Sequence, residues 1–519
     1  MKNLIFTLLW TMMTLYGRSQ DCRFLDELFP DVQRTDNIAY GVNATLLYFP
    51  VFGEAIPETL LLDLYEPVGD TSTLRPLVIY FHSGNFLPFP QNQSPIGTKK
   101  DSSAVEFCMR LARAGYVVAS ADYRLGWNPL ATNPIEGTIG IINAAYRGVQ
   151  DANTCIRYFK KSFVEDGNPY QIDTCRIVLF GDDTGGYLSV HAGALDRYSK
   201  IPESPQFNVV LGGSFYPMIM EYLNGDVEGK QYGVNTPPYP LFPFPAGDTL
   251  NYPNHVGYSS RFCAAVNLGG AVAECGWIEP GQPPIISVGT EYDQTTPYDS
   301  GFVWVGGNPI IKVCGPKGIT YQATAVGNNS SYIMTPDKYC SDFEQSVTAI
   351  ANSRNEGLEG LFPIIGNSLT DFNPWIFCEL AEPNCASYVD DFNPAMSREN
   401  ASLYIDSILA YVKPRLYKVL NLENPDGSCI VTSTDLIAEH DIDLQLFPNP
   451  STDEVTVHSG DNRIILKIDV YDSTGKHLHR YPGKQSNTQV IPVSGFVPGI
   501  YTVRIQFEDG ITARQMIIK

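Results

Sequence analysis

The chain has 519 residues, more than one ordinary domain needs, and its 44% hydrophobic and 18% charged residues are typical of globular proteins. The formal net charge is −21. Such an acidic chain repels nucleic acid and anionic membrane surfaces, which excludes nucleic acid as a partner. A zinc site is not expected either, because the sequence has no C-x-x-C pair and no histidine-rich cluster.

The first 20 residues contain a lysine, an apolar run from Leu4 to about Tyr16 and short polar residues after it. This pattern is typical of a secretory signal peptide, whereas a membrane anchor needs ~20 apolar residues. We therefore predict a signal peptide over residues 1–20. No later stretch is long and apolar enough to span a bilayer, so we expect no transmembrane segment.

Eleven cysteines in an exported chain indicate disulfides, and the odd number leaves at least one thiol unpaired. Sequence alone does not determine the connectivity. Four pairs that lie close in sequence are plausible local bridges: Cys155 with Cys175, Cys263 with Cys275, Cys314 with Cys340, and Cys378 with Cys385.

The first half of the chain alternates between strand and helix patterns. Residues 43–50 and 59–65 are typical of antiparallel strands, and the continuous apolar run at 74–81 is typical of a strand buried on both faces. An amphipathic helix capped by Asp101 is expected over 101–114, then a strand over 116–121 and a helix over 144–161. The alternation predicts an α/β fold with a doubly wound, mostly parallel sheet.

The second half begins with residues 201–258, which are rich in proline and aromatic residues and irregular in pattern. An insert of this length is usually a lid or a substrate wall. Strands are expected at 262–269 and 284–289, and a closing helix at 398–416. Residues 421–442 are interpreted as a linker, and the short alternating strands of 443–519 predict a small all-β sandwich.

Residues 176–193 read as an apolar strand, a glycine-bounded turn and a helix. The pattern G-x-S-x-G at such a turn is the nucleophile elbow of α/β-hydrolases, in which a strained turn exposes a serine above the sheet. In this sequence the pattern runs from Gly181 to Gly185, and Asp183 stands at the position of the serine.

The C-terminal stretch resembles the sorting domain of type IX secretion in the Bacteroidetes. The segments that carry the resemblance are FPNPS at 447–451, YDSTGK at 471–476, GIYTVRI at 499–505 and the closing RQMIIK. The resemblance implies recognition of residues 443–519 by the type IX secretion machinery and export through the periplasm and across the outer membrane. It also implies removal of the tail, with release or surface attachment of the body. The alternative is an immunoglobulin-like accessory module.

The body, residues 21–420, resembles secreted carboxylesterase-like α/β-hydrolases. The segments LLLDLYEP, FHSGNF, DYRLGW, YRGVQDA, IVLFGDDTGG and PPIISVGTEYDQTTPY occur in the order of that family. The resemblance implies Asp293 as the acid and an oxyanion hole near Gly84, Asn85 and Thr184, although Ser83 replaces a glycine of the H-G-G-x-F loop. The loop where relatives carry their histidine holds Asp371, Phe372 and Asn373 instead.

The roles open to Asp183 follow from this constellation. It is either a cap of the elbow helix or a carboxylate nucleophile that reacts only once, since no histidine lies between Asp293 and the linker to clear the ester. Thr184 is a less favoured replacement nucleophile. No cofactor is expected, except that Asp183, Asp293 and Asp371 converging on one pocket would offer oxygen ligands for Ca²⁺.

The leading hypothesis is a secreted protein of carboxylesterase descent with a degenerate triad, which binds a small molecule or a glycan without catalysis. The rival hypothesis is an active ester hydrolase, such as a carboxylesterase or a polysaccharide acyl esterase, with His82 or His191 as a rearranged proton carrier. His191 lies eight residues after Asp183, about two helical turns away, which favours a packing role. An imidazole within hydrogen-bond reach of Asp183 would favour the rival.

Overall fold

The computed structural model describes residues 22–519 except for several short stretches. Residues 1–21 and most of the expected linker are not among the described residues, so the predicted signal peptide and linker lie outside them. The remaining exceptions are residues 90, 93, 132, 212, 243, 294, 306–307, 335–336, 366–372, 380–384, 388–395, 424–441, 461, 473–475 and 508–509.

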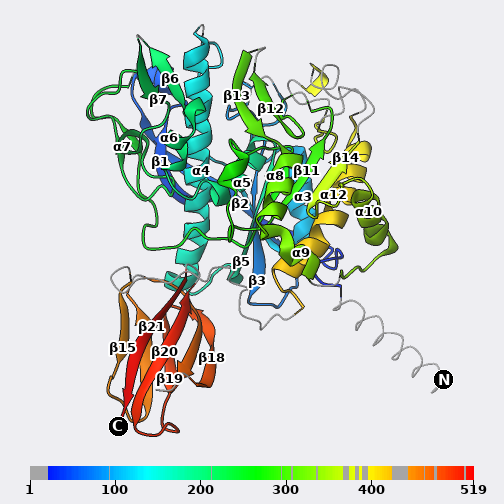
Figure 1. Cartoon of the computed structure of the whole chain (residues 1–519). Helices are drawn as coiled ribbons and strands as arrows, with labels where there is room; N and C mark the ends of the chain where they lie inside the picture. The colour runs from blue at the N-terminus through cyan, green and yellow to red at the C-terminus, as the bar shows by residue number, and fades with distance from the viewer. Residues whose placement is uncertain are drawn as a thin grey trace, which may run out of the picture.

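An eight-stranded sheet forms the centre of the body, with the order β1-β2-β4-β3-β5-β10-β11-β14 (Figure 1). The first two strands, β1 (Val32–Thr45) and β2 (Ile56–Pro67), pair antiparallel, and β2 is antiparallel to β4. All the other neighbours are parallel. The parallel part of the sheet thus consists of six strands: β4 (Val117–Ala121), β3 (Arg75–Phe81), β5 (Ile172–Asp182), β10 (Ala264–Leu268), β11 (Ile285–Thr290) and β14 (Leu361–Ile364). The predicted mostly parallel α/β-hydrolase sheet is confirmed.

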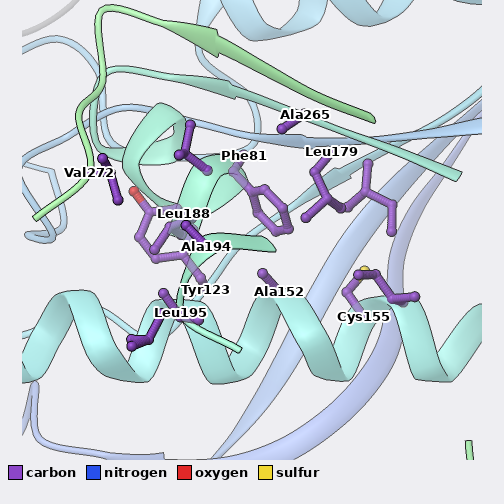
Figure 2. Close-up of a cluster of buried hydrophobic side chains, with 14 of the residues drawn as sticks. Phe81, Tyr123, Ala152, Cys155, Leu179, Leu188, Ala194, Leu195, Ala265 and Val272 are labelled. Atoms are coloured by element: carbon purple, nitrogen blue, oxygen red, sulfur yellow. The ribbon is translucent and has the colours of Figure 1, made fainter. Parts of the chain in front are cut away.

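Two hydrophobic cores cover the two faces of this sheet. Along β3, Leu77, Ile79 and Phe81 enter one core while Val78 and Tyr80 enter the other, because successive strand residues point to opposite faces. Figure 2 shows part of the first core, between the sheet and helix α4. Its helices are α4 (Pro134–Glu165), α5 (Thr184–Ala194) and α8 (Pro316–Ala325), and the second core holds α3 (Ser102–Arg113), α10 (Asp342–Asn352) and α12 (Arg398–Val419).

Several predicted elements differ from those observed. The strand expected at residues 43–50 ends at Thr45, and the short helix α2 (Phe49–Phe52) follows, with a proline in its first turn, where the missing amide is tolerated. Helix α4 begins ten residues before the predicted start, where the Asn133 side chain accepts from the Ile135 amide. Asp101 does precede α3, but its carboxylate accepts from the Gly97 and Thr98 amides instead of capping the helix.

The insert at 201–258 is mostly irregular, as expected, and contains two small hairpins. These are β6 (Asn208–Leu211) with β7 (Ser214–Pro217) and β8 (Gly233–Val234) with β9 (Thr249–Asn251). A third hairpin, β12 (Ser300–Val305) with β13 (Asn308–Cys314), was not predicted. The remaining short helices are α6 (Lys200–Glu203), α7 (Glu221–Asn224), α9 (Ser331–Met334) and the 3₁₀ turns Pro205–Phe207, Cys275–Trp277 and Asn328–Ser330.

The C-terminal region is an all-β sandwich, drawn in orange and red in Figure 1. One sheet has the order β15-β16-β19 and the other β18-β17-β20-β21. Their inward residues form a separate hydrophobic core that includes Val455, Ile468 and Val503. The predicted sandwich is therefore confirmed. Its strands are β15 (Leu444–Phe447), β16 (Glu454–Ser459), β17 (Ile465–Tyr471), β18 (His477–Ser486), β19 (Thr488–Pro492), β20 (Gly499–Phe507) and β21 (Gly510–Ile518).

The disulfides correct three of the four cysteine pairings expected from sequence proximity. The bridges join Cys22 to Cys340, Cys275 to Cys314 and Cys378 to Cys385, so only the last pair is confirmed. Cys175 is also disulfide-bonded, whereas Cys155 and Cys263 keep their thiols, as does the buried Cys108. Proximity in sequence misled here because adjacent strands and loops bring distant cysteines within bonding range.

The helices of the described residues do not include a membrane span. None of them is both long and apolar enough to cross a bilayer.

Candidate active site

The elbow between β5 and α5 has the sharp geometry that its glycines predict. Asp183 lies at the apex with φ of 48° and ψ of −109°, in the left-handed region that side-chain-bearing residues rarely adopt. A Cβ at Gly181 would lie 1.9 Å from the Gly185 carbonyl oxygen, and one at Gly185 would lie 2.0 Å from the Phe81 carbonyl oxygen. Only glycine therefore allows strand β5, helix α5 and the end of β3 to approach so closely.

The Asp183 carboxylate bonds to the loop after β3. Its Oδ2 accepts a hydrogen bond of 2.7 Å from the Ser83 hydroxyl. Burial raises the pKa of Asp183, and the Ser83 hydroxyl and the Thr184 amide oppose that shift by favouring the ionised form. Although Asp183 precedes α5, its side chain makes no N-cap hydrogen bond to that helix, and the helix amide that it contacts is that of the first residue, Thr184. The capping interpretation is therefore wrong, and the carboxylate instead ties the elbow to the Ser83 loop.

The loop proposed as the oxyanion hole has positive φ at three successive residues, which is strained for the two that carry side chains. Gly84, Asn85 and Phe86 all have positive φ, of 125°, 57° and 55°. The loop is fixed by the Trp127 indole, which donates to the Asn85 carbonyl at 2.8 Å. In serine hydrolases the amide after the nucleophile helps to bind the oxyanion. Here that amide belongs to Thr184, and it donates to the Asp183 carboxylate. It is therefore already hydrogen-bonded to an acidic group where a serine hydrolase would bind the oxyanion.

Asp293 lies in the loop after β11 with one carboxylate oxygen saturated. Its Oδ1 accepts from the Thr295 amide and hydroxyl, both at 2.8 Å, and from the Thr296 amide at 2.9 Å. Its Oδ2 lies on the side of Gly269, 3.7 Å from where a Cβ there would stand. Burial raises the pKa of Asp293 to about 7, although these donors lower it, and the negative charge of Asp183 adds to the increase.

The loop expected to carry a histidine brings Asn373 toward Asp293. The Asn373 Oδ1 would lie 3.0 Å from the same Cβ placed on Gly269, so the amide and the open oxygen of Asp293 face one small space. Asn373 is buried, and its Oδ1 has no hydrogen-bond partner among the described residues. Asp371 and Phe372 lie outside the described residues, so the three-carboxylate arrangement stays a prediction.

One further site residue, Asp182, and its partner Trp375 were missed by sequence reasoning. Asp182 is buried at the end of β5, and its Oδ1 accepts from the Trp375 indole at 2.7 Å. Burial raises the pKa of Asp182 well above its usual range, although the bond from Trp375 opposes that shift. The sequence signal that could have pointed to Asp182 is the pair of adjacent aspartates, Asp182 and Asp183, because two neighbouring carboxyl groups disfavour the ionisation of both.

Neither candidate histidine in the body bonds to Asp183. The Nδ1 of His191 donates to the Tyr187 carbonyl at 2.8 Å, and its Nε2 accepts from the Ala273 amide at 3.1 Å. That pattern requires the neutral ring, and burial lowers the pKa of His191 to about 4. His191 therefore packs the elbow helix and has no nitrogen left for proton transfer.

His82 is held by Ser83, Asp122 and Tyr123. Its Nδ1 lies 2.5 Å from the Ser83 carbonyl and its Nε2 lies 3.4 Å from Asp122 Oδ1. Burial lowers the pKa of His82, but the bond to Asp122, the negative charges of Asp122 and Asp101 and the Ser83 carbonyl together outweigh burial, so the net shift is upward. Its ring stacks on Tyr123, whose hydroxyl contacts the Thr184 hydroxyl at 3.1 Å. Thr184 is itself buried, which disfavours it as a nucleophile.

A cavity of about 110 Å³ opens in front of Asp183. Its walls are almost entirely apolar, and they come from α4, α5, the 201–258 insert and the unpredicted β12–β13 hairpin. The insert contributes Ile201, Phe207 and Ile219 to these walls, and its expected role as a lid or substrate wall stays a prediction. The arrangement can hold a small apolar group with one end against a carboxylate.

Comparisons with known proteins agree with the two-part organisation. Residues 445–519 match the family described as secretion system C-terminal sorting domain, and residues 62–209 match the family BD-FAE. A comparison with curated proteins finds no match.

Among solved structures, the chain is similar to esterase 2 of Thermogutta terrifontis in several states. The form phosphorylated by paraoxon is 15% identical, with 70% of this chain and 92% of that chain covered and a TM-score of 0.34. The propionate-bound form is 14% identical, with 74% and 95% covered and a TM-score of 0.34. The sheet order and the elbow show an α/β-hydrolase fold that is esterase-like over residues 62–209, and residues 445–519 are a C-terminal type IX sorting domain, which indicates export.

Proposed function

We propose that this protein is an exported, non-catalytic ligand-binding protein that retains the esterase fold and its pocket. The observation that carries the proposal is the residue at the elbow apex and the lack of a histidine beside it among the described residues. The residue there is Asp183, which bonds to Ser83, and no histidine among the described residues lies within 4.0 Å of its carboxylate. An ester-cleaving triad needs an imidazole to take and return a proton.

The carboxylate chemistry is blocked at its second step. A carboxylate at this position can attack an electrophile and form an ester, but water must then be activated to release it. The side chain that lies with Asp293 Oδ2 next to Gly269 is that of Asn373, and an amide cannot serve as a general base. Loss of the base stops turnover even where the rest of the site is intact.

One observation favours a second candidate, an ester hydrolase with a rearranged site. The Ser83 hydroxyl donates to Asp183 at 2.7 Å, the relation of a serine to its base. In that mechanism Ser83 would attack an acyl group and Asp183 would take its proton. Against this, Ser83 is only 2% exposed, which leaves little access for a substrate carbonyl.

Hydrolysis of p-nitrophenyl acetate by the full chain tests both candidates. The proposal expects the wild-type rate to equal the rates of Asp183→Ala and Ser83→Ala. Turnover that is lost in both variants would establish the rearranged hydrolase instead. Turnover lost in Asp183→Ala alone would refute the non-catalytic proposal through a carboxylate nucleophile.

Calcium binding by Asp183, Asp293 and Asp371 is a separate proposal. Among the described residues, the one close trio of potential ligands is Cys22, Asp26 and Cys340, and its two cysteines are bonded to each other. Calorimetric titration with CaCl₂ tests the proposal. Heat that is lost in Asp293→Asn would support it, and the absence of heat and of a thermal shift would refute it.

A further inference from the structure

We infer that the cavity in front of Asp183 binds a small hydrophobic amine, with the ammonium group at the Asp183 carboxylate and the apolar body inside the cavity. This inference rests on the proposed function, because an active hydrolase would place an acyl group there instead. It adds the chemical class of the ligand, which neither the fold nor the family matches specify.

The charges around the cavity are of one sign. Among the described residues no lysine or arginine lines it, and its single histidine, His191, has both ring nitrogens engaged and a lowered pKa. The wall tyrosines, Tyr146 and Tyr187, have pKa values raised by burial and are neutral. Asp183 is thus the one described wall residue that brings a charge, and an anionic ligand such as a free carboxylic acid would be repelled.

The Asp183 carboxylate has no counter-charge within the described part of the chain. Its side chain accepts from the neutral Ser83 hydroxyl, and no lysine or arginine there forms an ion pair with it. A carboxylate oxygen accepts more than one bond, so Asp183 keeps capacity for a further donor. Because a half-buried charge without a counter-charge is costly, a cationic donor would offset more of that cost than a neutral one.

The remaining walls suit the body of such a ligand. Six of them are aromatic, and these are Phe86, Tyr146, Tyr187, Phe207, Trp277 and Trp304. Aromatic faces attract ammonium groups as well as apolar carbon. Trp304 on β12 is 49% exposed, so it borders the solvent side of the cavity. The volume of about 110 Å³ is somewhat below that of an engineered cavity of ~150 Å³ that takes benzene, which limits the body to one ring or a short alkyl chain.

A hard metal cation fits these walls less well. Calcium takes six to eight oxygen ligands, roughly, and keeps water where the protein does not supply them. The cavity offers one carboxylate, that of Asp183, and a few neutral polar groups, whereas most of its lining side chains are apolar. An organic ammonium needs fewer acceptors and gains from the apolar walls.

Calorimetric titration of the full chain with three probes of matched size tests the inference at neutral pH. The probes are 2-phenylethylamine, 2-phenylethanol and 3-phenylpropionate. We expect the amine to bind about ten- to a hundredfold more tightly than the alcohol, the range of a charge-assisted bond, and the acid not to bind. Asp183→Asn keeps the side-chain shape and an acceptor for Ser83, and it should reduce amine affinity to that of the alcohol. Asp342→Asn, which removes an exposed carboxylate on α10, should change nothing.

The outcomes separate the inference from the proposed function. Equal affinity for amine and alcohol, or an amine preference that survives Asp183→Asn, would overturn the inference and leave a ligand-binding cavity in place. Tighter binding of the acid would also overturn it. Hydrolysis of p-nitrophenyl acetate by the wild type would instead overturn the proposed function, and is measured on the same preparation.

Discussion

Two substitutions should rebuild a working triad on this fold. Asp183→Ser restores the nucleophile at the apex, where the strained turn is already formed. Asn373→His should then place an imidazole near Asp293, whose Oδ1 is held by three donors, because Asp293 Oδ2 and the Asn373 amide oxygen both lie next to Gly269. That free oxygen is the one a triad uses to orient its histidine.

The expected gain follows from what each group supplies. Asp183→Ser alone lacks a general base, and a positioned base contributes about 10²–10⁴-fold. Adding Asn373→His to Asp183→Ser should therefore raise kcat/KM by at least about 100-fold, which corresponds to roughly 2.7 kcal/mol of transition-state stabilisation. The oxyanion loop limits the absolute rate, because Ser83 stands where relatives have glycine.

The assay is steady-state hydrolysis of p-nitrophenyl acetate, with folding checked by circular dichroism. Asp183→Ser with Asn373→Gln is the matched control, since it fills the same space without a base. A folded Asp183→Ser/Asn373→His variant no faster than this control would show that residue 373 does not occupy the place of the proton carrier, and the reasoning about the site would be wrong.

Three further outcomes test the fold and its electrostatics. Gly181→Ala should lower the free energy of unfolding by about 3 kcal/mol or more in urea titrations, because its Cβ would meet the Gly185 carbonyl at 1.9 Å; a loss below about 1 kcal/mol would contradict the close crossing. The pKa of Asp293 rises from 3.8 to about 7 in the folded state, so the folded state binds this proton more tightly than the unfolded state does. The contribution of Asp293 to the free energy of unfolding therefore falls as the pH rises between those two values. The free energy of unfolding of Asp293→Asn, relative to that of the wild type, should therefore increase by up to roughly 4 kcal/mol as the pH rises from about 4 to about 8. A difference between the two proteins that does not change with pH would refute this reasoning. Replacing Cys275 and Cys314 by alanine opens a loop of 39 residues and should cost about 4 kcal/mol in the same titrations, whereas an unchanged midpoint would exclude a stabilising bridge.

Much of the fold was predictable because burial leaves a local pattern. The continuous apolar run of β3 and the glycines around Asp183 reflect a strand covered on both faces and a close crossing of strand and helix. The alternating strands of residues 443–519 reflect a sandwich with one buried face per sheet. These features are encoded by neighbouring residues, so the sequence displays them directly.

The elements that were missed have weaker local patterns. The β12–β13 hairpin carries the exposed Phe302 and Trp304, so its residues do not alternate cleanly between apolar and polar. The Cys22–Cys340 bridge spans 318 residues, a distance at which spacing carries no information. Both depend on which surfaces the chain brings together after it has folded.

The sequence by itself determined the chemical inventory of the site: an aspartate at the elbow, an acid in the loop after β11, and no histidine between that acid and the linker. Only the tertiary structure decided which groups meet. It joined Ser83 to Asp183 across 100 residues, placed Asp293 Oδ2 and the Asn373 amide oxygen next to Gly269, and engaged both nitrogens of His191. The physical reason is that residue types and local periodicity are written along the chain, whereas hydrogen bonds and charge pairing depend on distances set by long-range packing.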